Sequence, residues 1–287
     1  MGVWIEVGAK VLAYGATLLV IGAAVTRLWL LPRVAAADSS ARRAAEAALA
    51  SLQVGAALVL LAALLVRAFG HTVAAFDLPD ALQPDNLRLI AFESQWGGSW
   101  KRQVLAAGLL LLASIWLRLE RSRMAALMAG AMALVTAEAL TLTGHAASYP
   151  YGSLVHGFHI VAAGAWAGTI AAVLALTAPA VRHLRSPLLH AFAPVAMGAV
   201  AIVLASGLFA TWRYLGALSN LWTTTYGIAL LIKVVFVGDM LVLGAINWRR
   251  LRAGGGGEAV PVTAWIEVAV ASTVVLITAF LTETEHP

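Results

Sequence analysis

Four of the seven histidines have a spacing suited to one metal site. His156 and His159 are three residues apart, which in a helix puts both rings on one face with Cβ atoms about 5–6 Å apart. Two imidazoles at this separation can bind one transition-metal ion. His145 lies one short connection earlier, and His71 is a possible fourth ligand. The pattern predicts a metal site of His145, His156, His159 and His71, with helix capping as the alternative role of each ring.

Two residues of the same segments lie about two helical turns deeper. Glu138 precedes His145 by seven residues and Trp166 follows His159 by seven, a depth of about 10 Å in each case. A carboxyl group inside an apolar segment is costly unless it faces a partner or water. We therefore expect Glu138 on a transport path, and Trp166 either beside that path or in simple packing.

Other polar or soft side chains could extend such a path. Met124 and Met128 are spaced four residues apart, and their thioethers suit Cu(I), although methionine also fills irregular cores. Lys233 and Asp239 share one apolar segment but lie six residues apart, so they face different directions. Each needs a partner on another segment, in a transport route or in a structural bond.

Several kinds of chemistry have no support in the sequence. The chain has no cysteine, which excludes disulfides, thiolate metal sites and catalytic thiols. It also lacks a phosphate-binding Gly-rich loop, a dinucleotide-binding glycine pattern and the serine hydrolase and zinc protease motifs. We expect no enzymatic activity and no catalytic residues.

The elements that must position these residues are membrane helices. Hydrophobic residues make up 61% of the 287 residues and charged residues 11%, compared with about 25% charged in soluble domains. A membrane-spanning helix needs about 20 apolar residues. Eight such stretches predict an all-α integral membrane protein: Val7 to Leu31, Ala47 to Phe69, Gly97 to Leu117, Met124 to Thr143, Leu154 to Ala178, Ala191 to Trp212, Thr224 to Ile246 and Val262 to Leu281.

The arginines predict the orientation in the membrane. They gather in alternate connections, for example at Arg42, Arg121 and Arg249, whereas residues 144–155 and 214–223 contain no Arg or Lys. Because cytoplasmic loops are rich in Arg and Lys, both termini are expected outside the cytoplasm, with the first span retained. Residues 70–95 then form an acidic outer loop that either meets a partner or is simply solvated.

The two halves of the chain resemble each other. Gln95-Trp96-Gly97 opens the third span and Thr225-Tyr226-Gly227 opens the seventh. Each half has four spans, so the halves would share one orientation in the membrane, as in transporters built from parallel repeats. We predict two tandem four-helix halves within one membrane domain, residues 1–143 and 144–287.

The order of short motifs along most of the chain resembles the CopD copper-resistance family of bacterial inner-membrane proteins. The family implies eight spans, copper uptake from the periplasm, periplasmic histidine ligands that correspond to His145 and His159, and a separate CopC-like periplasmic copper carrier as partner. His156 departs from the family pattern, in which an acidic residue is more usual. The resemblance rests on Gly144-His145-Ala146, His159 with Trp166 and Gly168, Ser206-Gly207, Thr225-Tyr226-Gly227 with Lys233, Asn247 with Arg249, Glu267 and Pro287.

The sequence and the resemblance together predict copper transport or uptake across the inner membrane, as Cu(I) or Cu(II), in support of copper resistance. Two alternatives stay open. Histidines at helix ends could instead bind haem b in a membrane oxidoreductase. The chain could also be an assembly factor for a respiratory oxidase that transports nothing.

Overall fold

A computed structural model describes residues 1–36, 38–143, 151–252, 262–285 and 287. Eight helices of the described residues are long and apolar enough to cross a membrane, so the predicted all-α membrane architecture is confirmed. In chain order these helices are α1 (Gly2–Val25, continued by η1, Thr26–Leu30, and α2, Leu31–Val34), α3 (Ser39–Ala81), α5 (Gln95–Glu120), α6 (Arg123–Leu140), α7 (Gly152–Ala163, continued by η4, Gly164–Gly168, and α8, Thr169–Leu174), α10 (Arg185–Tyr214), α12 (Thr225–Arg252) and α13 (Val262–Leu281).

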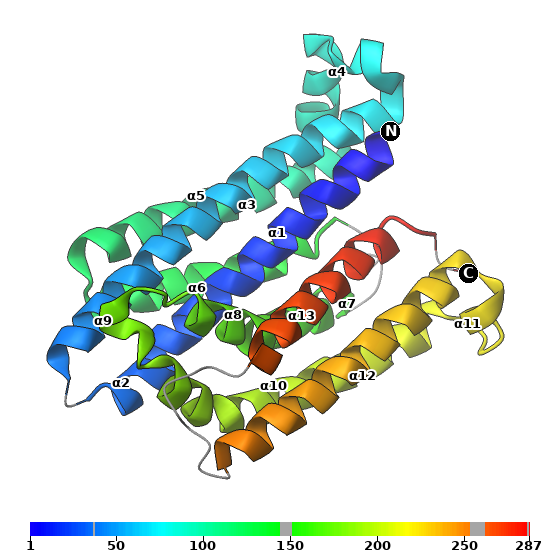
Figure 1. Cartoon of the computed structure of the whole chain (residues 1–287). Coiled ribbons are helices and arrows are strands. Elements are labelled where there is room, and N and C mark those ends of the chain that lie inside the picture. Colours follow the sequence, from blue (N-terminus) through cyan, green and yellow to red (C-terminus); the bar gives the residue numbers. More distant parts are fainter. Residues whose placement is uncertain (37, 144–150, 253–261, 286) are drawn as a thin grey trace.

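Helix α1 lies in the middle of the bundle (Figure 1), in contact with α3 and α6 on one side and with η4, α8 and α13 on the other. It can do so because its faces carry small residues. A methyl group at Gly22 would overlap the backbone of Gly168, and one at Gly168 would overlap the Leu18 carbonyl oxygen. Close backbone approach through small residues is how membrane helices gain packing energy. Helix α1 therefore joins the two parts of the molecule.

Both termini lie on one side of the bundle, which we call the terminal side. The Trp4 ring stacks on Phe280 with centroids 6.1 Å apart, and Lys10 forms an ion pair with Glu283. Helices α1 and α13 are thus antiparallel neighbours whose free ends meet. Residues at the far ends of these helices lie on what we call the opposite side.

Hydroxyl and carboxylate side chains fix several helix starts. Asp38 caps α3 by accepting hydrogen bonds from the backbone of Ala41 at 2.9 Å and from Ser40. These bonds lower the pKa of the Asp38 carboxyl below its ordinary value. Ser122 caps α6 in the same manner, through the Ala125 N–H.

The predicted acidic loop at residues 70–95 is largely helical. Helix α3 continues to Ala81 with a kink at Asp77, where φ is 60°, and is followed by α4 (Pro84–Arg88) and η2 (Leu89–Glu93). Pro79 follows this kink and lies close to the end of α3. Figure 1 shows α4 projecting from the bundle beside the N-terminus. The remaining short helices are α9 (Pro179–Arg182) and α11 (Asn220–Thr223).

The two aromatic-glycine motifs occupy equivalent local settings. Gly97 N–H bonds the Ser94 hydroxyl at 2.9 Å, and Gly227 N–H bonds the Thr224 hydroxyl at 3.0 Å. A methyl group at either glycine would overlap the backbone of the short helix just before it, η2 or α11. This likeness agrees with the predicted repeat, while the division into halves at residue 143 stays a prediction.

Candidate functional site on the terminal side

His159 is held in one orientation by helix α10. Its Nδ1 lies 2.8 Å from Ser206 Oγ, and that hydroxyl donates to the Ile202 carbonyl at 2.5 Å. When the single hydroxyl hydrogen of Ser206 is donated to the Ile202 carbonyl, Ser206 accepts from His159, and the ring then carries its proton on Nδ1. The Nε2 atom is then left with a lone pair. Gly207 lies beside the ring, and a methyl group there would be in ordinary van der Waals contact with His159 Cε1, at 3.9 Å.

His156 lies one turn nearer the terminal side on the same helix. Its ring meets Tyr214 of α10 edge-on, with centroids 6.0 Å apart and planes at 72°. The ammonium of Lys233, on α12, acts electrostatically on both imidazoles. Helices α7, α10 and α12 therefore converge on a cluster of His156, His159, Ser206, Tyr214 and Lys233, which we call the histidine cluster.

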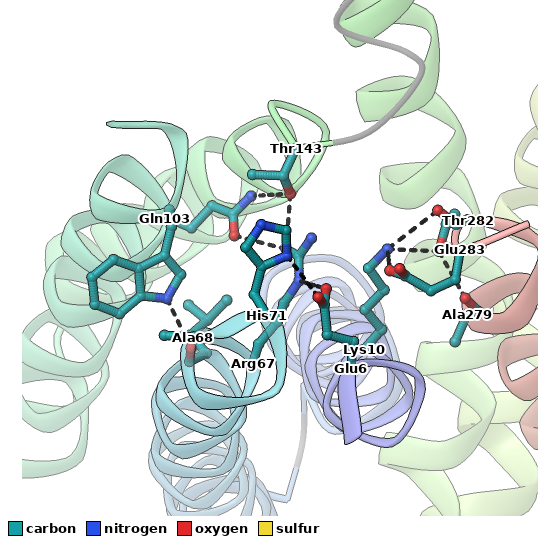
Figure 2. Close-up of polar contacts among 12 residues, drawn as sticks. Glu6, Lys10, Arg67, Ala68, His71, Gln103, Thr143, Ala279, Thr282 and Glu283 are labelled. Carbon is teal, nitrogen blue, oxygen red and sulfur yellow. Dashed lines mark hydrogen bonds and ion pairs between the residues drawn. The ribbon is translucent and has the colours of Figure 1, made fainter. Parts of the chain in front are cut away.

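His71 belongs to another group of side chains, shown in Figure 2. Its Nδ1 lies 2.7 Å from Glu6 Oε1, and its ring stacks on Trp96 with centroids 4.0 Å apart. Glu6 also pairs with Arg67, at 3.7 Å. Arg67 in turn donates to Gln103 at 3.1 Å and to Thr143 at 2.8 Å. Helices α1, α3, α5 and the end of α6 thus share one connected set.

The same set extends to the C-terminal end of the chain. Figure 2 shows Glu6 and Lys10 on one face of α1, with Glu6 directed at His71 and Arg67 and Lys10 directed at Thr282 and Glu283. Lys10 Nζ lies 3.1 Å from Thr282 Oγ1 and forms an ion pair with Glu283. We call Glu6, Lys10, Arg67, His71, Gln103 and their partners the ion-pair network.

Of the four predicted ligands, three lie in the described residues and one does not. His156 and His159 share the histidine cluster, whereas His71 lies in the ion-pair network with partners on other helices. His145 lies outside the described residues. Within the described ranges, no group of three or more His, Cys, Asp or Glu side chains is arranged to hold a metal ion.

Glu138 is half-buried and faces α7 from α6. A Cβ at Gly157 would overlap its Oε2 atom, so the carboxylate lies directly against the α7 backbone between His156 and His159 in sequence. Among the described residues its carboxylate has no hydrogen bond or ion pair. Gly157 and His159 point to nearly opposite sides of a helix with 3.6 residues per turn, so α7 separates Glu138 from His159.

The deeper predicted residues differ in burial. Trp166 is only 5% exposed, in the π-helical turn η4, and lines a cavity between η4, α10, α12 and α13. By contrast, Met124 and Met128 are 60% and 41% exposed on the outside of α6, and Asp239 is exposed on α12. These three side chains lie outside the bundle interior. On α6, the buried alanines face the neighbouring helices, and Met124 and Met128 do not.

Two sets of polar residues within the spans have no role predicted from the residues alone. Glu6, Lys10 and Arg67 are buried in apolar spans, and the spacing of Glu6 with Lys10 and of Arg67 with His71, four residues in each pair, could have indicated two facing polar stripes. Glu267 and Asn247 entered only through the family resemblance. For Glu267 the signal in the sequence is an ionisable residue within an apolar span, the same signal that identifies Glu138.

The class of protein defined by these features is a multi-pass α-helical membrane protein with polar side chains gathered at one end of the bundle. Comparison with protein families gives two matches: "Copper resistance protein D-like, N-terminal domain" over residues 1–154 and "Copper resistance protein D" over residues 186–281. The chain belongs to the copper resistance protein D family. No curated protein and no solved structure matches it. The family resemblance drawn from the motifs is thereby confirmed.

Proposed function

We propose that the protein carries copper inward across the bacterial inner membrane, with the terminal side in the periplasm and histidines as the first ligands. The observation that carries the proposal is the orientation of His159. A histidine that donates its Nδ1 proton to a fixed acceptor presents a neutral Nε2 lone pair, which is how metal-binding imidazoles are oriented.

The distribution of arginines supports this orientation. The connection from α5 to α6 and the end of α12 lie on the opposite side and contain Arg121, Arg123, Arg249 and Arg250. In bacterial inner-membrane proteins such loops face the cytoplasm. The histidine cluster then faces the periplasm, where copper arrives.

His156 and His159 are the proposed centre of the ligand set. His145, which the family resemblance suggests, is the proposed third ligand, and His71 is an accessory one. Beyond them we place Trp166 and Lys233 beside the inward path, because Trp166 lines the cavity below the cluster and Lys233 acts on both rings. Glu138 is proposed to attract the cation from the other face of α7.

The projecting segment from α3 to η2 is the proposed docking surface for a CopC-like periplasmic copper carrier. Its four carboxylates, Asp77, Asp80, Asp85 and Glu93, are all exposed, and Arg88 pairs with Glu93 at 3.6 Å. Exposed charges of one sign on a projecting segment steer a partner of opposite charge.

Copper content of the purified protein tests the proposal. We expect the double variant His145→Ala/His159→Ala to lose bound copper, because it removes two imidazole ligands. The matched control is His183→Ala/His190→Ala, which removes two exposed histidines on the opposite side and should keep the copper. His71→Ala reports separately on the accessory ligand.

Two outcomes would contradict this function. Unchanged copper content in His145→Ala/His159→Ala would remove the histidines from the binding site. A Soret absorption band that shifts on reduction with dithionite would instead indicate haem b, and so the oxidoreductase alternative.

A further inference from the structure

A cavity of about 290 Å³ lies below the histidine cluster, toward the opposite side. It is bounded by η4 and α8, α10, α12 and α13. Its wall is almost entirely apolar, and the exceptions that matter for chemistry are a carboxylate, an amide, an indole and two thioethers. These are Glu267, Asn247, Trp166, Met197 and Met240.

Glu267 is 3% exposed and is held by a neutral donor. Its Oε2 atom accepts from Asn247 Nδ2 at 2.9 Å, and Asn247 is oriented by the Thr263 hydroxyl, which donates to Oδ1. The Trp166 indole lines the same cavity as the carboxylate. The carboxylate lies beside α12, because a methyl group at Gly244 would be 3.6 Å from Glu267 Oε1, in ordinary van der Waals contact.

The absence of a counter-charge distinguishes Glu267 from the carboxylates of Glu6 and Glu46. Glu6 pairs with Arg67 at 3.7 Å and Arg27 with Glu46 at 3.8 Å. Among the described residues no cationic side chain pairs with Glu267. A carboxylate inside a membrane bundle without a cation must bind a proton or take a cation from elsewhere.

The cavity also supplies soft ligands. Met240 is 3% exposed and lies on the same face of α12 as Gly244 and Asn247, four and seven residues later. Met197 also lines the cavity from α10, but it is 63% exposed, so most of its side chain lies outside the packed interior. Thioether sulfur selects Cu(I) over Cu(II) and over hard cations, and one carboxylate balances the single charge of that ion.

We propose that this cavity is an intramembrane Cu(I) site, with the Met240 thioether and the Glu267 carboxylate as ligands. The inference rests on the proposed function, because the ion reaches the cavity from the histidine cluster. Trp166, two turns below His159 on the same continuous segment, separates the two sites. Copper thus passes from imidazole nitrogen to thioether sulfur as it moves inward.

The chain offers an unusually direct test, because it has six methionines and no cysteine. Any copper–sulfur scattering in the X-ray absorption spectrum of the protein loaded anaerobically with Cu(I) must therefore come from methionine. We expect such scattering in the unmodified protein. It should be lost in Met240→Leu, a substitution that nearly conserves volume, and kept in Met128→Leu, which changes a lipid-facing methionine.

Glu267→Gln tests the carboxylate, because it keeps the shape and a hydrogen-bonding carbonyl but removes the charge. Titration with Cu(I) against a competing chelator should give an affinity of the sulfur-containing site at least about tenfold weaker. The inference is overturned if the unmodified protein shows only nitrogen and oxygen scattering. It is also overturned if Glu267→Gln leaves Cu(I) affinity unchanged while proton uptake is lost, since Glu267 would then be a proton site.

A His156→Ala/His159→Ala variant separates this inference from the proposed function. With Cu(I) supplied directly in detergent, we expect nitrogen scattering to fall while sulfur scattering persists. Loss of sulfur scattering in Met240→Leu with the histidine-dependent copper intact places both sites as proposed. Sulfur scattering that survives the Met240→Leu/Met197→Leu double variant contradicts the cavity site alone and leaves the histidine cluster standing.

Discussion

The ion-pair network and the histidine cluster lie at the same end of the bundle but satisfy their polar groups in different ways. In the network, Glu6 contacts both Arg67 and His71, and Arg67 has two further acceptors. In the cluster, the two imidazoles share their surroundings with Lys233 and no described carboxylate pairs with them. Buried groups with matched partners stabilise a fold, whereas basic groups gathered without an acid have a stability cost that a ligand could offset.

From this contrast we infer a structural role for the ion-pair network and a binding role for the histidine cluster. The network ties α1 to α3, α5 and α13, whose contacts hold the central helix in place. The cluster joins α7, α10 and α12, and α12 is one of the least buried spans of the bundle. Sites that must admit and release an ion are expected in the less tightly packed region.

Removing Arg67 should have the largest effect and would test the structural role of the network. Arg67→Ala leaves Glu6, Gln103 and Thr143 without their shared partner, and breaking a buried pair typically costs about 3–5 kcal/mol. We expect a marked loss of stability in detergent, measured by thermal unfolding. Copper bound per folded chain should not change.

Arg102→Ala is the control for this change, because Arg102 lies on the same bundle but is exposed and bonds only within its own helix. Its effect should stay within about 0.5 kcal/mol. If Arg67→Ala instead abolished copper binding at unchanged stability, the assignment of the two regions would have to be reversed.

The contact between α1 and η4 should have the next largest effect, because it joins the two regions. Gly168→Ala introduces a methyl group that overlaps the Leu18 carbonyl oxygen. We expect about 1–3 kcal/mol of destabilisation, the usual cost of overpacking. Gly15→Ala, on α1 where a methyl group meets nothing within 4 Å, should be neutral or stabilising in the same unfolding assay.

The sequence predicts much of the fold, because a membrane span has a strong signal in composition and length. The structure confirms eight spans, and the end of the last one coincides with the predicted Leu281. Helix α3 extends on both sides of the predicted apolar stretch, from Ser39 to the kink at Asp77 and then to Ala81. How far a helix continues outside the hydrocarbon core of the membrane is set by local helix propensity, which hydropathy does not measure.

The candidate site was harder to predict, because periodicity gives the face of a helix but not its rotation toward neighbours. The spacing of His156 and His159 correctly indicated one helix, but nothing in the sequence revealed that Ser206, 47 residues later, would orient His159. Likewise, the four-residue spacing of Met124 and Met128 is the same whether the stripe faces the interior or the lipid. Which face is buried depends on how all eight helices pack.

The smallest effect on stability, and the sharpest test of the comparison, should come from Ser206→Ala. This substitution removes the acceptor that fixes the His159 proton on Nδ1 but leaves both histidines in place. Loss of such an orienting partner typically weakens metal binding by about 10–100-fold, so we expect copper affinity to fall within that range while thermal unfolding changes little. Ser272→Ala is the matched control, because Ser272 also donates to the carbonyl four residues earlier but is exposed on α13. Equal copper affinities in the two variants would mean that the Ser206 contact only fills space and does not orient His159 for metal.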